Sequence, residues 1–113
     1  MKVAELAARV DLTPEEIAEI LELFLDTSSK NLGSLRAALQ EKDRLKILSY
    51  AHSIKGAAGN LGLTEIYEIA REMERNAANH NLVKVQEAMG TIQEKINGLG
   101  AMIRGMRSPA LQG

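Results

Sequence analysis

The chain has 113 residues, a length typical of a single domain with one modest core. Its 14 Lys and Arg residues nearly balance its 15 Asp and Glu residues, and without a basic run or a series of aromatic residues this excludes nucleic acid as an expected partner. The chain has no cysteine, which excludes disulfides and thiolate metal sites and fits the cytoplasm, and no apolar run approaches the roughly 18 residues of a membrane span.

The chain begins with a predicted short helix and continues with a predicted long one. The first is indicated by the apolar residues Val3, Leu6, Ala7 and Val10. In "DLTPEEIAEI" Thr13 is a good N-cap, Pro14 occupies the first helical position, and Glu16 completes a capping box. The long helix then presents one apolar face, made of Ile17, Leu21, Phe24, Ser28, Leu32, Leu35 and Leu39. Gly33 and the polar run "TSSKN" indicate a kink in its middle.

Three further helices follow at short intervals. Asp43 is the expected cap of a helix that runs to about Leu61, with Gly62 as its C-terminal stop. Thr64 is the expected cap of the next helix, which the segment "ANHN" ends. Asn81 is the expected cap of the last helix, whose glycine-containing second half is expected to fray.

The apolar faces of these helices define the predicted fold. With only three aromatic residues in the chain, the predicted core is aliphatic. The inner face of the fourth helix contains Ile66, Ile69, Ala70, Met73 and Ala77. The last helix carries a long apolar seam of Leu82, Val85, Met89, Ile92, Ile96, Leu99, Ile103 and Met106. We therefore predict an all-α fold, an up-down-up-down four-helix bundle with a short additional N-terminal helix over residues 1–107, followed by a disordered tail at 108–113. The long seam suits packing within a monomer, which we expect, and would also suit a dimer.

The third helix carries a histidine beside glycines that weaken it. Its apolar stripe consists of Ile47, Ala51, Ile54, Ala58 and Leu61. His52 lies about 140° from this stripe on a helical wheel and therefore points to solvent. Gly56 and Gly59 follow it by four and seven residues, on the same face, although each glycine costs a helix about 1 kcal/mol relative to alanine. Such a cleared surface around an exposed histidine predicts a landing site for a large, flat partner.

Two other residues near His52 are candidates for the same site. Lys55, three residues further on, is within reach of a phosphoryl group on the imidazole and would offset its negative charge. Leu45 and Leu48 also lie on the His52 side, where they either pack under the leading helix or form an apolar rim for a partner. His80 is expected to be a loop or cap residue, and no metal site with His52 is expected. The alternating charges of "EIAREMER" are expected to form pairs within their own helix and to need no partner.

The stretch "AHSIKGAAGNLG" resembles the signature of histidine-containing phosphotransfer (HPt) domains, in which Lys-Gly stands at the third and fourth positions after the histidine. The resemblance extends over about residues 1–107. It implies that His52 accepts a phosphoryl group on its outer ring nitrogen, that Lys55 offsets the charge, and that Gly56 and Gly59 give access. The implied partners are receiver domains of response regulators and of a hybrid histidine kinase.

The chain is expected to be a phosphoryl carrier in a two-component phosphorelay and not an enzyme. It has no Walker-type loop, no ATP-binding glycine loop and no carboxylate cluster for magnesium, so neither a cofactor nor a bound metal is expected. Two alternatives stay open at this point. The chain could be the phosphorylation domain of a larger, chemotaxis-type histidine kinase, or a helical adaptor whose histidine is never phosphorylated. The start at Met1 and the short tail favour a freestanding protein.

Overall fold

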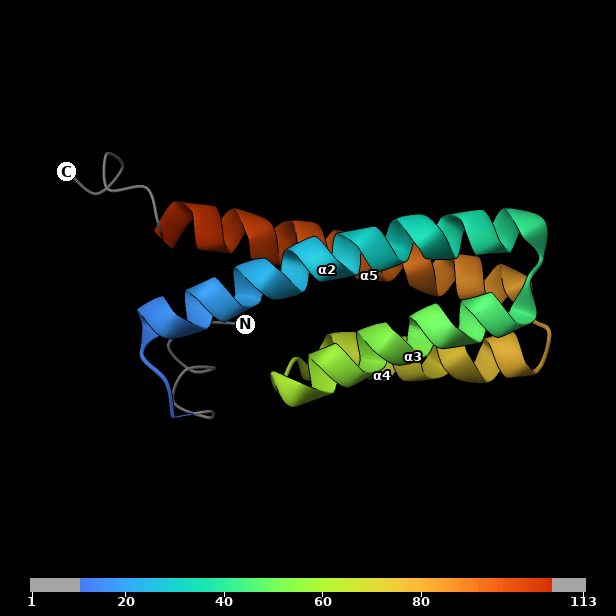
Figure 1. Ribbon diagram of the computed structural model, residues 1–113, viewed down its shortest axis with the longest axis horizontal. Helices are drawn as coiled ribbons and strands as arrows, with labels where there is room; N and C mark the ends of the chain where they lie inside the picture. The colour runs from blue at the N-terminus through green and yellow to red at the C-terminus, as the bar shows by residue number, and fades with distance from the viewer. Residues whose placement is uncertain (1–10, 107–113) are drawn as a thin grey trace.

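Four α-helices form the part of the chain that the computed structural model describes, residues 11–106 (Figure 1). They are α2 (Pro14–Glu41), α3 (Arg44–Asn60), α4 (Thr64–Ala78) and α5 (Leu82–Met106). No strand occurs among these residues, which confirms the all-α prediction. The predicted leading helix and the predicted tail at 108–113 lie outside the described residues.

The helices begin where the sequence predicts them to begin if a side chain caps the first turn. The Thr13 hydroxyl accepts a hydrogen bond from the Glu16 backbone N–H at 3.1 Å, and the Glu16 carboxylate accepts one from the Thr13 N–H at 3.0 Å, which completes the predicted capping box. Asp43 accepts from the Lys46 N–H at 3.2 Å, and Asn81 accepts from the Lys84 N–H, also at 3.2 Å. All three caps are confirmed.

The turn between α3 and α4 is a Schellman motif. Gly62 adopts a left-handed φ of 72°, its N–H donates to the Gly59 carbonyl, and the Leu63 N–H donates to the Ala58 carbonyl at 2.9 Å. This confirms Gly62 as the stop of α3. The predicted cap at Thr64 is wrong: Leu63 is the N-cap of α4, makes no side-chain cap bond, and is fully buried. Burial of Leu63 fixes the direction of the chain there, so Thr64 is already helical.

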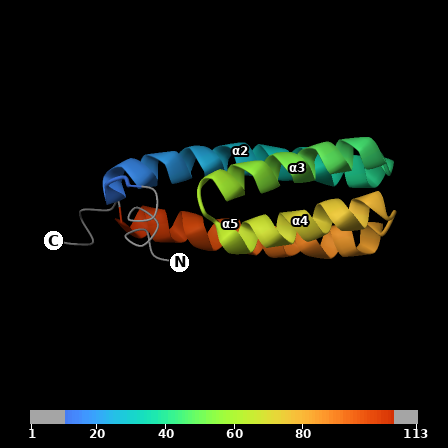
Figure 2. The same ribbon diagram turned by 90° about the horizontal axis from the view of Figure 1, so that it is seen from below.

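The four helices enclose an aliphatic core. Helix α2 packs against α3, α3 against α4, α4 against α5, and α5 against α2, so that the described helices close into a bundle (Figure 2). The predicted stripes are largely buried, with Leu39, Leu61, Ile69 and Leu82 only partly covered. The segment with the predicted kink does not interrupt the helix: α2 continues through the exposed Gly33, and Ser28, Leu32 and Leu35 around it are buried.

The helices differ in length, and this decides what surrounds the C-terminal end of α3. With 28 and 25 residues, α2 and α5 extend at one end well past α3 and α4, which have 17 and 15 (Figure 1). The C-terminal end of α3 therefore lies against the first half of α2 and leaves a hollow between them. Over residues 11–106, none of these helices is both long enough and apolar enough to span a bilayer.

Candidate functional site

His52 lies at the middle of α3 with its side chain in solvent. The predicted stripe residues Ile47, Ala51, Ile54 and Ala58 are all fully buried, which fixes the rotation of the helix. The His52 side chain, on the opposite side, is 69% exposed. The prediction that this histidine faces solvent is confirmed.

A carboxylate from α4 contacts both predicted polar residues of the site. The two oxygens of Glu74 bind different partners: Oε2 lies 2.9 Å from His52 Nδ1, and Oε1 accepts a hydrogen bond from Lys55 Nζ at 2.6 Å. The Glu74 and Lys55 side chains are only 26% and 22% exposed, so this pair is more sheltered than a surface ion pair. His52, Lys55 and Glu74 therefore form one hydrogen-bonded unit, which we call the His52 triad.

The triad fixes the state of the His52 ring. An ionised carboxylate only accepts hydrogen bonds, so the nitrogen facing Glu74 must carry the proton. In the neutral ring Nε2 then holds the free lone pair, on the side away from Glu74. The arrangement thus holds a nucleophilic nitrogen toward solvent in a defined orientation.

The ionised form of Glu74 is stabilised by its neighbours. The hydrogen bond from Lys55 holds the pKa of Glu74 below its ordinary value of 4.5, and the hydrogen bond from His52 acts in the same direction, while partial burial opposes both. At neutral pH the carboxylate is therefore charged, as the tautomer argument requires.

This lowered pKa predicts a pH-dependent stability. A carboxyl group whose pKa is lower in the folded chain stabilises the fold fully above its unfolded pKa and loses that contribution as the pH falls through the folded value. We expect the free energy of unfolding, measured with urea, to fall less steeply between about pH 5 and pH 3 in Glu74→Gln than in the parent chain. Glu72→Gln, which removes a surface pair with Arg75 on the same helix, is the control. Equal pH dependence in the parent and Glu74→Gln would contradict the assignment.

Sequence reasoning missed Glu74. It assigned the charges of "EIAREMER" to pairs within one helix, and two such pairs exist, Arg71 with Glu68 at 2.6 Å and Arg75 with Glu72 at 3.1 Å. Glu74 is the exception, because it follows the buried Met73 and lies on the side of α4 that packs against α3. That position beside the apolar stripe is the one local signal that could have singled it out.

The two glycines differ in their surroundings. A Cβ on Gly56 would meet no atom within 4 Å, whereas one on Gly59 would lie 3.2 Å from the Tyr67 ring of α4. Gly59 therefore has a role in helix packing that the sequence did not reveal. Of the two leucines, Leu48 is half-buried against the core and Leu45 is 72% exposed, so Leu45 is the more accessible of them.

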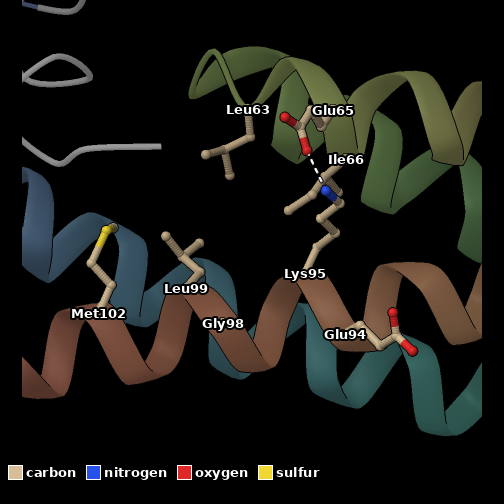
Figure 3. A pocket seen from close by; sticks show the side chains of 8 residues that line it. All are labelled: Leu63, Glu65, Ile66, Glu94, Lys95, Gly98, Leu99 and Met102. Carbon is tan, nitrogen blue, oxygen red and sulfur yellow. Dashed lines mark hydrogen bonds and ion pairs between the residues drawn. The ribbon is translucent and has the colours of Figure 1, made fainter.

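Two features elsewhere in the described chain take no part in this site. His80 has a left-handed φ of 61° and closes the C-terminal turn of α4, as its predicted role as a loop or cap residue requires. A hollow of about 350 Å³ lies between the start of α4 and the second half of α5, where Glu65 and Lys95 form an ion pair beside Ile66, Leu99 and Met102 (Figure 3). Residues 11–106 contain no group of three His, Asp or Glu side chains that could hold a metal ion.

The described helices thus form a bundle with an exposed histidine whose ring is held by a carboxylate from the neighbouring helix. The family model for the Hpt domain matches residues 19–103, and the chain belongs to this family. Hpt domains are phosphocarrier modules of two-component signalling that interact with receiver domains. No curated protein and no solved structure shows significant similarity to this chain.

Proposed function

We propose that His52 is the phosphoryl acceptor, that it takes the group from the aspartate of one receiver domain, and that it passes the group to the aspartate of another. The contact that supports this most directly is the one between Glu74 and Nδ1, on a ring that is 69% exposed. The contact leaves Nε2 as the nucleophile, and the exposure of the ring leaves room for a large partner around it. The proposal takes residues 1–107 as one up-down-up-down bundle with a short N-terminal helix, acting as a cytoplasmic monomer.

The transfer step needs little from this chain beyond the triad. Nε2 attacks the phosphorus of the receiver's aspartyl phosphate, an N–P bond forms, and the P–O bond to the receiver breaks and leaves a free carboxylate. The His52 ring gains positive charge during the attack, and the Glu74 carboxylate, 2.9 Å from the protonated Nδ1, stabilises that charge. The return step reverses these changes. The receiver supplies the aspartate and its own metal ion.

In this scheme the Lys55 ammonium lies near two anions, the Glu74 carboxylate and the phosphoryl group. In the unphosphorylated chain it binds Glu74, and a phosphoryl group on Nε2 adds a second anion, with a charge of about −2, near the same ammonium. Because the Lys55 side chain is only 22% exposed and bonds to Glu74, its removal is expected to lower stability as well as to affect the phosphoryl group.

We expect Lys55→Ala to fold with a loss of about 1 kcal/mol of stability, because Glu74 loses a charged hydrogen-bond donor. We also expect a shorter half-life of the phosphohistidine. Lys55→Arg, which keeps the charge, is the control and should restore most of the half-life. The measurement is urea unfolding together with the decay of labelled phosphoprotein, and an unchanged decay rate in Lys55→Ala would remove Lys55 from the site.

The source of the phosphoryl group is tested by two parallel incubations. One contains a phosphorylated receiver domain, and the other contains an isolated histidine-kinase catalytic domain with ATP. The proposal expects labelling of His52 from the receiver. Labelling from the catalytic domain alone would assign the chain to a chemotaxis-type kinase, and labelling from neither would favour a helical adaptor.

A further inference from the structure

The second glycine after His52 lies beside an aromatic ring of α4. A Cβ on Gly59 would stand 3.2 and 3.4 Å from Cδ2 and Cε2 of Tyr67, closer than the separation at which carbon atoms pack best. The Tyr67 side chain is partly buried and packs against the core. The ring therefore lies close to α3 at a position where this helix has no side chain to keep it away.

The same edge of the interface between α3 and α4 holds the contact between His52 and Glu74. Gly59 follows His52 by seven residues, and Tyr67 precedes Glu74 by seven. Seven residues make close to two helical turns, so in each helix the two residues lie on one face, about 10 Å apart along the axis. One register of α3 against α4 thus brings both pairs together.

The distance between the two helix axes decides whether Glu74 reaches His52. The axes of packed helices lie about 8–10 Å apart, depending on the size of the side chains between them. The fully buried residues of α3 and α4 include the small side chains Ala51, Ala58, Ala70 and Ala77. Tyr67 is a bulky group on the edge that also holds the His52 contact. Lengthening the bond between His52 Nδ1 and Glu74 from 2.9 Å by about 1 Å would end it.

We propose that Tyr67, whose ring occupies the space that Gly59 leaves open, is a positioning residue: it sets the separation of α3 and α4 that holds Glu74 against His52 Nδ1. The effect on phosphoryl transfer rests on the proposed function, whereas the place of the proton on the ring is a property of the chain alone. The two glycines then have separate roles. Gly56 leaves room for a partner, and Gly59 leaves room for Tyr67.

The test locates the proton on the His52 ring by ¹⁵N NMR of the chain labelled in histidine, at a pH where the ring is neutral. We expect the proton on Nδ1 in the parent chain, and the tautomer mixture of an unrestrained ring in Gly59→Leu and in Glu74→Ala. Combining Gly59→Leu with Tyr67→Ala moves the bulk from α4 to α3 at nearly constant volume and should restore the parent spectrum. Gly90→Leu, at an exposed glycine of α5 with open space around its Cβ position, is the matched control and should keep the parent spectrum.

The same variants are then labelled with phosphoramidate, a small donor that reacts without docking. We expect Gly59→Leu and Glu74→Ala to be labelled several-fold more slowly than the parent chain, because less of the ring has a free lone pair on Nε2. The double variant should react at the parent rate. If Tyr67 only supported the fold, Gly59→Leu would lower the free energy of unfolding in urea and leave the proton and the labelling rate unchanged.

The outcomes separate this inference from the proposed function. A folded Gly59→Leu variant with the parent spectrum would overturn the positioning role and leave His52 as the acceptor, and so would a double variant that does not regain the parent spectrum. If Gly59→Leu unfolds, Gly59→Met takes its place, since methionine is of similar size and more adaptable, and the same spectral change is required of it. A parent chain that neither phosphoramidate nor a phosphorylated receiver labels, with the spectra as expected, would instead contradict the proposed function.

Discussion

The His52→Gln variant is expected to carry no phosphoryl group, whichever donor is supplied. Glutamine keeps a polar side chain of similar reach at a 69% exposed position, so the fold should be retained. It lacks a ring nitrogen with a free lone pair, so the N–P bond cannot form. We expect the parent chain to take up one acid-labile, base-stable phosphoryl group and His52→Gln to take up none, as measured by intact-protein mass spectrometry.

His80→Gln is the control for this experiment. His80 is the other histidine of the chain, and its backbone closes the C-terminal turn of α4 in a left-handed conformation. Its ring plays no part in the His52 triad, so the variant should be phosphorylated like the parent. Phosphate found on His80 or on a serine would contradict the assignment of His52.

A series of substitutions at Gly56 is expected to separate docking from folding. Gly56 is exposed in the interior of α3, and an added Cβ would meet no atom within 4 Å. Since a helix interior favours alanine over glycine by up to about 1 kcal/mol, Gly56→Ala should keep or raise the melting temperature. Gly56→Gln and Gly56→Arg should also fold, but their side chains would stand where a receiver approaches His52. We expect the rate of transfer from a phosphorylated receiver to fall steeply from Ala to Gln to Arg.

The matched control for this series is Gly98→Gln. Gly98 is also an exposed glycine in a helix with open space around its Cβ position, but it lines the hollow between α4 and α5 (Figure 3). This variant should fold and transfer normally. Unfolding of all three Gly56 variants would make Gly56 a packing residue. Normal transfer by all three would place the docking surface elsewhere.

The features of this bundle that could be predicted from the sequence depend on residues that lie close together along the chain. The caps at Thr13, Asp43 and Asn81 each join groups three residues apart, so their hydrogen bonds can be deduced from spacing alone. The orientation of His52 followed in the same way, because a helical period relates it to the buried stripe of its own helix. The prediction that Thr64 caps α4 was wrong because burial of Leu63, a tertiary effect, sets the start of that helix.

The parts of the site that the sequence did not reveal depend on how α3 meets α4. Glu74 lies 22 residues from His52 along the chain, and no local pattern relates the two side chains. The closeness of the Tyr67 ring to the Cβ position of Gly59 likewise depends on how far apart the two helices lie at that point. Sequence periodicity gives the inner face of each helix but not the rotation of one helix against the next. For this reason the exposure of His52 could be predicted and the residue that holds its ring could not.

The central claim is that the outer nitrogen of His52 carries the phosphoryl group. The most direct measurement labels the chain from a ³²P-labelled receiver, hydrolyses the product in alkali, and separates the two isomers of phosphohistidine by chromatography. Because Glu74 occupies Nδ1 in the structure, we predict Nε2-phosphohistidine as the product in the parent chain and none in His52→Gln. Recovery of Nδ1-phosphohistidine, or of no phosphohistidine from a chain that the active receiver contacts, would contradict the account.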